Sequence, residues 1–264
     1  MVALNPRKYG EGPFKVAVLH GGPGAPGSAA PIAQGILCNG SVLEPFQTAD
    51  SVDGQGEELR GILESCTSLP VVLVGHSWGA WLGYIYAARY PAHVAKLVLV
   101  ASGPFLPEYA ERIMETRMSR LTDDDRGTVQ GIMERLGGGV PKSKDLALLG
   151  KILGRADAYH PIDAVPDAVE CQAGLHIKVW GEAEELRRSG RLLDMGRNIT
   201  CPVVAVHGDF DPHPAEGVRG PLSGILANFR FILLEKCGHE PWAERLARGP
   251  FFKILNEELE AVCG

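Results

Sequence analysis

The chain has 264 residues, of which 45% are apolar and 22% charged, a composition typical of a globular protein with a sizeable core. Its formal net charge of −6 provides no basic excess, which argues against nucleic acids and anionic membrane surfaces as partners. No apolar stretch reaches the length of about 18 residues that spans a bilayer, and residues 1–15 lack the apolar centre of a signal peptide, so we expect a cytoplasmic protein.

Short apolar runs bounded by glycine or proline predict the strands. They are nearly continuous in Val, Ile and Leu, which is typical of strands buried on both faces of a parallel sheet. In chain order they are residues 16–20, 71–75, 97–102, 203–208 and 231–235. Helices are predicted between several of them, at 53–65, with Asp53 as a capping residue, and at 78–90. The alternation predicts an α/β fold with a mostly parallel, helix-flanked sheet.

The alternation stops between Pro104 and Asn198, where no buried strand is predicted. Charged helical stretches take its place, at 106–121, 122–136, near 143–154 and at 182–196. Thr122 followed by Asp125 resembles a capping signal at the start of the second stretch. We predict a helical cap at residues 104–198, inserted into an α/β core of residues 1–103 and 199–264; the alternative is a helical subdomain that only adds bulk.

The predicted strand at 71–75 leads directly into Gly-His-Ser-Trp-Gly, which opens the apolar helix at 78–90. A G-x-S-x-G pattern between a buried strand and a helix is the context of a nucleophile elbow, a sharp turn that exposes a serine at the edge of a sheet. Gly75 and Gly79 keep the surroundings of Ser77 small. The strand–helix context favours a nucleophilic Ser77 over an ordinary glycine-rich bend.

Two later strands end in residues that could activate a serine. His239 follows the last predicted strand, and Asp209 and Asp211 follow the strand before it. Because the carboxyl ends of parallel strands meet at one edge of a sheet, we expect these side chains near Ser77. We favour Asp211 as the partner of His239 and expect Asp209 to hold the turn.

A metal site is the alternative for this region, because His207, Asp209, Asp211 and His213 alternate along the chain. On an extended strand such residues would share one face, but the intervening glycine and proline predict a turn. We therefore expect no metal, with His213 at the rim of the site. The six cysteines are widely spaced without a C-x-x-C pair, which predicts reduced thiols and not a zinc site.

The glycine-rich loop after the first predicted strand could supply an oxyanion hole, which needs two backbone N–H donors. We expect one donor from Gly22, with Gly21 as the alternative, and the other from Trp78, the residue after Ser77. A phosphate-binding loop is not supported, because neither G-x-G-x-x-G nor Gly-Lys-Ser/Thr occurs there. His20 is expected to brace the loop.

Four motifs together make the sequence resemble the α/β-hydrolase superfamily. They are HGGPG at 20–24, GHSWG at 75–79, HGDFDPHP at 207–214 and CGHEPW at 237–242. The resemblance implies an eight-stranded, mostly parallel sheet with a helical cap. It further implies a Ser77, Asp211 and His239 triad that acts on a small acyl substrate through an acyl-enzyme, without metal or organic cofactor.

HGGPG and the tryptophan after Ser77 are also similar to the proline iminopeptidase branch of this superfamily. That branch usually has glycine at the position of His76, and acidic cap residues hold the substrate's amine. The predicted cap contains Glu170, Glu182, Glu184 and Glu185, as helices generally do. We therefore expect hydrolysis of an ester or related acyl bond, with iminopeptidase activity or low-turnover ligand binding as the alternatives.

The sequence assigns no residue to substrate binding. Candidates to line a pocket or to pack the cap on the core are Met114, Met118, Leu121, Met133 and Leu136, with Trp81 and Trp242 near the motifs.

Overall fold

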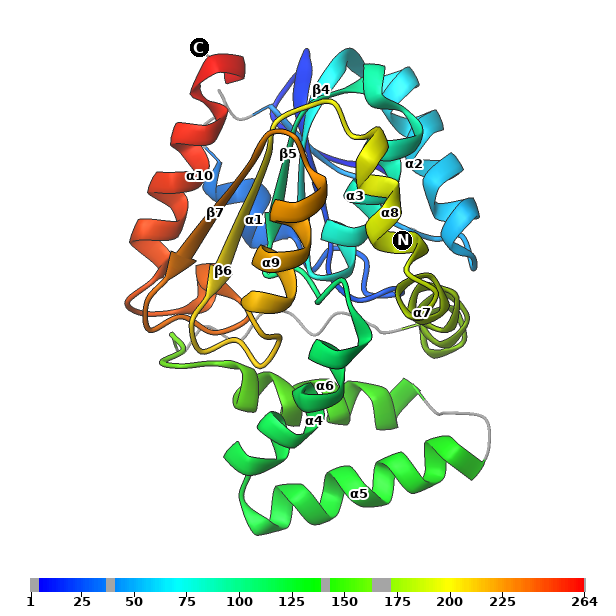
Figure 1. Cartoon of the computed structure of the whole chain (residues 1–264), viewed down its shortest axis with the longest axis vertical. Coiled ribbons are helices and arrows are strands. Elements are labelled where there is room, and N and C mark those ends of the chain that lie inside the picture. Colours follow the sequence, from blue (N-terminus) through cyan, green and yellow to red (C-terminus); the bar gives the residue numbers. More distant parts are fainter. Residues whose placement is uncertain (1–4, 37–40, 139–142, 163–171, 264) are drawn as a thin grey trace.

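The computed structural model describes residues 5–36, 41–138, 143–162 and 172–263 (Figure 1). These residues form one seven-stranded sheet in the order β1-β3-β2-β4-β5-β6-β7. The strands are β1 Arg7–Tyr9, β2 Phe14–Leu19, β3 Val42–Glu44, β4 Thr67–His76, β5 Val94–Val100, β6 Val203–Gly208 and β7 Phe229–Leu234. All neighbours pair in parallel except β1 and β3. The predicted α/β architecture is confirmed.

Helices cover both faces of the sheet, and this burial explains the continuous apolar runs. In β4, Val72 and Val74 belong to a core shared with α1 and α10, whereas Val71 and Leu73 belong to a core on the other side, shared with α2, α3 and α9. All four side chains are inaccessible to solvent, as expected when successive residues of a strand point to opposite covered faces. The helices are α1 Ala30–Gly35, α2 Val52–Cys66, α3 Trp78–Arg89, α9 Glu216–Ile225 and α10 Arg248–Cys263.

The strand count differs from the expectation. The described residues contain seven strands, where the family resemblance implied eight. The five predicted strands correspond to β2 and β4 to β7, while β1 and β3 were missed. Each of these two strands has three residues, too few to show a period, and β1 is partly exposed.

The helix caps agree with the sequence in one case and differ in another. The hydroxyl of Ser51 accepts a hydrogen bond from the Gly54 amide over 3.0 Å and so caps α2. Asp53 was the wrong choice: it lies in the first turn and pairs with Arg89. Thr122 accepts a hydrogen bond from the Asp125 amide over 3.2 Å, as its spacing indicates.

Three helices extend beyond the carboxyl ends of the central strands (Figure 1). We call them the outer helices: α4 Pro107–Arg120, α5 Asp123–Gly138 and α6 Ser143–Asp157. They share a small apolar core of their own, made of Leu121, Val129, Ile152 and Ala156. Arg117 of α4 and Asp157 of α6 form a bidentate ion pair, with the two nitrogen–oxygen distances at 2.8 and 2.6 Å.

The second half of the predicted cap packs differently. Helix α7, Ala173–Arg188, contributes Leu175, Val179 and Ala183 to the core above the sheet. Gly190, with φ +77°, separates it from the short helix α8, Arg191–Asp194, so the single helix predicted at 182–196 is wrong in both start and continuity. The domain boundary at residues 104–198 stays a prediction.

The fold brings three loops to one edge of the sheet. β4, β6 and β7 are parallel and end at the side where the outer helices lie (Figure 1). Ser77 follows β4, Asp211 lies in the loop after β6, and His239 in the loop after β7. None of the helices in the described ranges combines the length and apolar character that crossing a bilayer requires.

Candidate active site

Ser77 lies on a strained turn between β4 and α3. Its backbone has φ +51° and ψ −112°, a conformation that a non-glycine residue rarely adopts. The turn is tight because a Cβ on Gly75 would lie 2.2 Å from the Gly79 carbonyl oxygen. The Ser77 amide donates to the carbonyl of Val100 in β5 over 3.0 Å. Close packing and this bond hold the serine at the strand end.

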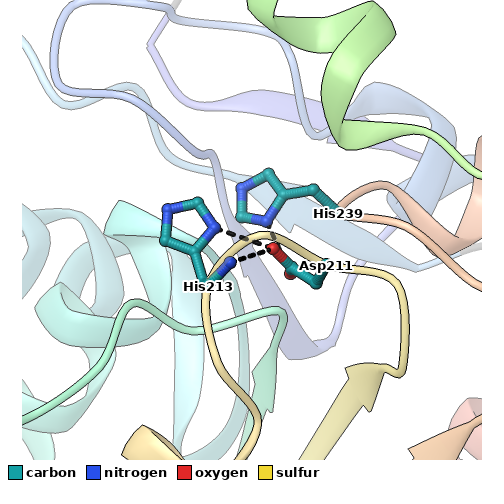
Figure 2. A group of neighbouring side chains, drawn as sticks. All are labelled: Asp211, His213 and His239. Carbon is teal, nitrogen blue, oxygen red and sulfur yellow. Dashed lines mark hydrogen bonds and ion pairs between the residues drawn. The ribbon is translucent and has the colours of Figure 1, made fainter. Parts of the chain in front are cut away.

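Asp211 and His239 are hydrogen-bonded to each other (Figure 2). The Nδ1–H of His239 donates to Oδ2 of Asp211 over 2.8 Å, and the Asp211 carboxylate is inaccessible to solvent. Asp209 does not share this contact: its Oδ1 accepts from the Cys237 amide over 3.1 Å and ties the loop after β6 to the loop after β7. Of the two candidate aspartates, the structure therefore brings Asp211 to the histidine.

His76 connects the serine turn to the histidine loop. Its Nε2 lies 3.1 Å from the His239 carbonyl oxygen, and its ring centroid lies 4.9 Å from that of His239. The rings of Trp242 and His76 meet edge-to-face, at 4.6 Å between centroids. Ser77 and His239 are therefore held in adjacent, directly bonded segments.

The glycine-rich loop after β2 packs on the same turn. A Cβ on Gly21 would lie 2.5 Å from Nδ1 of His76 and 3.3 Å from Cβ of Ser77, so only glycine fits there. Gly22 adopts φ +63° in a turn closed by the Ala25 amide, which donates to the Gly22 carbonyl over 3.1 Å. Trp78 opens α3, where N–H groups of the first turn have no partner within the helix.

His20 braces this loop, as the sequence indicated. Its Nε2 accepts a hydrogen bond from the Gln47 amide over 3.2 Å, and its Nδ1 lies 3.1 Å from the Gly21 carbonyl oxygen. Complete burial lowers the pKa of His20 to about 4. The ring is therefore neutral and structural.

The structure places His213 against Asp211 and not at the rim that the sequence predicts. We expected it at the rim, but its side chain is only 12% exposed and contacts Asp211 directly. Both its amide and its Nδ1–H donate to Oδ1 of Asp211, over 2.9 and 2.8 Å. Its ring stacks on His239 at 4.4 Å and 29° (Figure 2). A histidine two residues after the aspartate, within a Pro-containing turn, is the signal that could have indicated this contact.

Burial and neighbouring charges shift the pKa values of the site residues in different directions. Burial alone would raise the pKa of Asp211, but the charges of His239, His213 and His207 hold it well below its usual range. Burial alone would lower the pKa of His239, but Asp211 raises it above the ordinary 6.5. Burial lowers the pKa of His213 to about 4 in spite of Asp211. Near neutral pH an ionised Asp211 thus faces one histidine that accepts a proton and one that stays neutral.

Burial, reinforced by the nearby His239, also keeps the pKa of His76 well below 6.5. A neutral His76 with its proton on Nε2 donates that proton to the His239 carbonyl oxygen.

The ligand atoms of Asp211, His213 and His239 lie within 4.8 Å of one another. Two imidazoles and a carboxylate form a donor set that suits zinc or a similar transition metal. Both Nδ1 atoms are already hydrogen-bonded to Asp211, so a metal ion would have to replace both bonds. The alternating ligand set suggested by the sequence does not assemble, since Asp209 lies outside this group.

The outer helices are fastened to the loops of the site. The His239 amide donates to the Asp157 carbonyl at the end of α6 over 2.9 Å. The buried carboxylate of Glu244 accepts from the amides of Tyr159, His160 and Gly238 over 2.6, 2.7 and 2.9 Å. The histidine loop and the segment after α6 therefore form one hydrogen-bonded unit.

Three of the four glutamates considered as binders of a substrate amine lie in the described residues, and all three are engaged elsewhere. Glu182 accepts from the Val52 amide over 2.7 Å, Glu184 lies 3.2 Å from Arg187, and Glu185 pairs with Arg188. Glu170 lies outside the described residues. None of the three described glutamates contacts Ser77 or His239 by a hydrogen bond or ion pair.

Two hollows of the described surface lie next to the outer helices. One of about 480 Å³ is lined by residues of α4 and α5, and one of about 390 Å³ is lined by residues of α4 and α7. Met114, Met118 and Met133 line the first. Neither hollow is lined by Ser77, Asp211 or His239.

The other pocket candidates pack into cores. Leu121 is buried among the outer helices, and Trp81 stacks on Trp180 at 5.8 Å between centroids. Trp242 is buried against His76. The side chain of Leu136 lies outside the described residues. Among the described cysteine side chains, Cys66, Cys201 and Cys237 are free thiols.

Comparison with known proteins identifies the fold family of the chain. The profile of the family described as alpha/beta hydrolase fold matches residues 22–245. A proline iminopeptidase of Heyndrickxia coagulans is 25% identical over 252 residues, which cover 87% of this chain and 85% of that protein. The solved structure of VinJ has a TM-score of 0.71 at 19% identity and covers 97% of this chain and 94% of that one.

The esterase EaEST from Exiguobacterium antarcticum has a TM-score of 0.67 at 17% identity, with coverage of 97% and 94%. At these identities the two solved structures establish the fold and not the substrate.

Proposed function

The chain belongs to the alpha/beta hydrolase fold family and is a hydrolase, and we propose that it is a serine hydrolase with Ser77 as nucleophile, His239 as base and Asp211 as the acid. The observation that carries the proposal is the 2.8 Å bond between His239 and buried Asp211, at the sheet edge where Ser77 lies on its strained turn. A serine needs a base held in one orientation by a third group, and these residues supply the three groups.

The reaction follows from these roles. Oγ of Ser77 attacks the substrate carbonyl while Nε2 of His239 takes the serine proton. Asp211 keeps the Nδ1–H tautomer of His239 and stabilises the imidazolium that forms. His239 then gives the proton to the leaving group, and water hydrolyses the acyl-enzyme in a second cycle. The amides of Gly22 and Trp78 are our candidates for binding the oxyanion; one such donor is typically worth about 3 kcal/mol.

We favour an ester or related acyl compound of small size as the substrate. Glu182, Glu184 and Glu185 are bonded to a backbone amide or to arginines, which leaves none of these three assigned to a substrate amine. Iminopeptidase activity is the second candidate, supported by the 25% identical proline iminopeptidase. A panel of p-nitrophenyl esters, thioesters and prolyl amides distinguishes them: hydrolysis of prolyl amides alone would contradict the ester proposal.

A fluorophosphonate probe tests the nucleophile. We expect covalent labelling of the wild type, mapped to Ser77 by mass spectrometry, and no labelling of Ser77→Ala. Ser102→Ala is a matched control, because Ser102 is a buried serine that follows the neighbouring strand β5. Equal labelling of Ser77→Ala and wild type would overturn the assignment. Tight ligand binding without turnover of any ester would favour a binding protein instead.

A further inference from the structure

The mechanism proposed above leaves His213 without a role, although it makes more contacts with Asp211 than His239 does. Its amide and its Nδ1–H both reach Oδ1, while His239 reaches only Oδ2. The backbone carbonyl oxygen of His213 is also engaged, because it lies 2.8 Å from Nε2 of His207. This contact fixes the loop that carries His213. His213 is therefore held on both sides of its Cα and cannot turn away without breaking these bonds.

We propose that His213 is a positioning residue, which holds Oδ1 of Asp211 so that Oδ2 remains directed at Nδ1 of His239. This inference rests on the proposed function, because it assigns His213 a task through Asp211 and His239. The stacked ring, 4.4 Å from that of His239, restrains the second partner as well. Figure 2 shows the two rings side by side, with the dashed lines converging on the Asp211 carboxylate.

Geometry explains why such a residue is needed. A carboxylate can rotate about its Cβ–Cγ bond, and the bond to His239 engages one oxygen only. The buried Asp211 side chain is inaccessible to water, which could otherwise satisfy the second oxygen. Two donors from one residue on Oδ1 occupy that oxygen and stop the rotation. Buried acceptors that are left without donors cost stability and orientation.

His213 also divides the charge of Asp211. A hydrogen bond donated to a carboxylate stabilises its negative charge and weakens its pull on a second proton donor. With His213 present, Asp211 therefore attracts the proton of His239 less strongly than it would alone. Rotation about the Cβ–Cγ bond leaves the carboxylate charge beside His239, so removing the donor should raise the pKa of His239 and make it a base that is protonated over a wider pH range.

Other charges near the two rings must be held constant in such a test. The titratable or charged groups that face His213 and His239 from the surrounding elements are Asp211, His207, His76, Arg117, Asp157 and Glu240. A substitution at position 213 leaves the identity of each of these groups unchanged.

A pair of variants separates the donor from the ring. His213→Phe keeps an aromatic ring on His239 and loses the Nδ1–H, whereas His213→Asn places an amide N–H near the position of Nδ1 and loses the ring. We expect His213→Phe to lower kcat about tenfold and to move the acidic limb of kcat/KM up by about half a pH unit or more. His213→Asn should restore the acidic limb to near its wild-type position. Thermal unfolding of each variant checks that it is folded.

Imidazole NMR on the wild type provides a test that needs neither variant nor substrate. We expect His213 to be neutral at pH 6 to 8 with its proton on Nδ1, and the ring of His239 to titrate separately. A proton on Nε2 of His213, or an acidic limb that stays unmoved in His213→Phe, would overturn the inference. If Ser77 of the wild type is not labelled, the proposed function is overturned instead. The NMR result then still decides whether His213 is neutral with its proton on Nδ1.

Discussion

Nε2 of His76 donates a hydrogen bond to the backbone carbonyl of His239 over 3.1 Å, so the residue before the proposed nucleophile holds the loop of the proposed base. This contact gives a reason for histidine at a position where the iminopeptidase branch usually has glycine. A glycine there could not reach the histidine loop.

His76→Ala should therefore lower kcat by about 100-fold, because a displacement of the base by about 1 Å can cost that much. His76→Gln, whose side-chain amide can donate from a position near that of Nε2, should recover much of the loss. Steady-state kinetics with a p-nitrophenyl ester measures both. The control is His93→Ala, since His93 lies beyond the opposite end of α3, where it hydrogen-bonds Tyr86. Equal effects of the alanine and glutamine variants would contradict the explanation.

The two aspartates after β6 should differ sharply. Asp211→Asn keeps the shape but removes the charge that selects the tautomer of His239, and in serine proteases such a change lowers kcat by about 10⁴-fold. Asp209→Asn retains an oxygen that can accept from the Cys237 amide, so its kcat should stay near that of the wild type. A larger loss from Asp209→Asn than from Asp211→Asn would reverse the assignment.

Activity should fall on the acidic side at a pH above the ordinary histidine value. Asp211 raises the pKa of His239 above 6.5, and only the unprotonated ring can accept the serine proton. As pH falls through this raised pKa, kcat/KM should therefore decline. In Asp211→Asn the titration of His239, followed by NMR, should move down, because the charge that raises it is gone. An acidic limb below 6.5 in the wild type would contradict the expected sign.

The tight elbow should be visible as stability. A methyl group at Gly75 would lie 2.2 Å from a backbone oxygen, so Gly75→Ala forces the turn apart and should destabilise the protein by at least about 1–3 kcal/mol. Gly61→Ala, at an exposed position of α2 with no atom within 4 Å of the new methyl, should instead stabilise it by about 0.5–1 kcal/mol. Urea unfolding measures the difference. Equal stabilities for the two variants would contradict this packing.

The sequence-based prediction is correct where one local pattern determines the structure. Continuous apolar runs indicate strands covered on both faces, and G-x-S-x-G between such a strand and a helix indicates the turn at Ser77. It failed where distant contacts decide. Helix α7 begins at Ala173 and packs on the core beside Trp81. No local sequence pattern predicts its start or its packing.

The same limit applies to His213. Its side chain folds back onto Asp211 and meets His239, which is 26 positions further along the chain, so the contact depends on the arrangement of two loops. Strands β1 and β3 were missed for a different reason, because three residues carry no readable period.

The hydrogen bonds between the histidine loop and the segment after α6 also bear on how such a protein could diversify. Helices that lie between two strands in the chain, as α4, α5 and α6 do between β5 and β6, can in principle be exchanged by recombination. Here the donor that reaches Asp157 is the amide of His239 itself, and Glu244 binds Tyr159, His160 and Gly238 together. A chimera with helices from another protein would therefore have to keep residues 157–160 of this chain. Without them the loop of His239 would lose these hydrogen bonds.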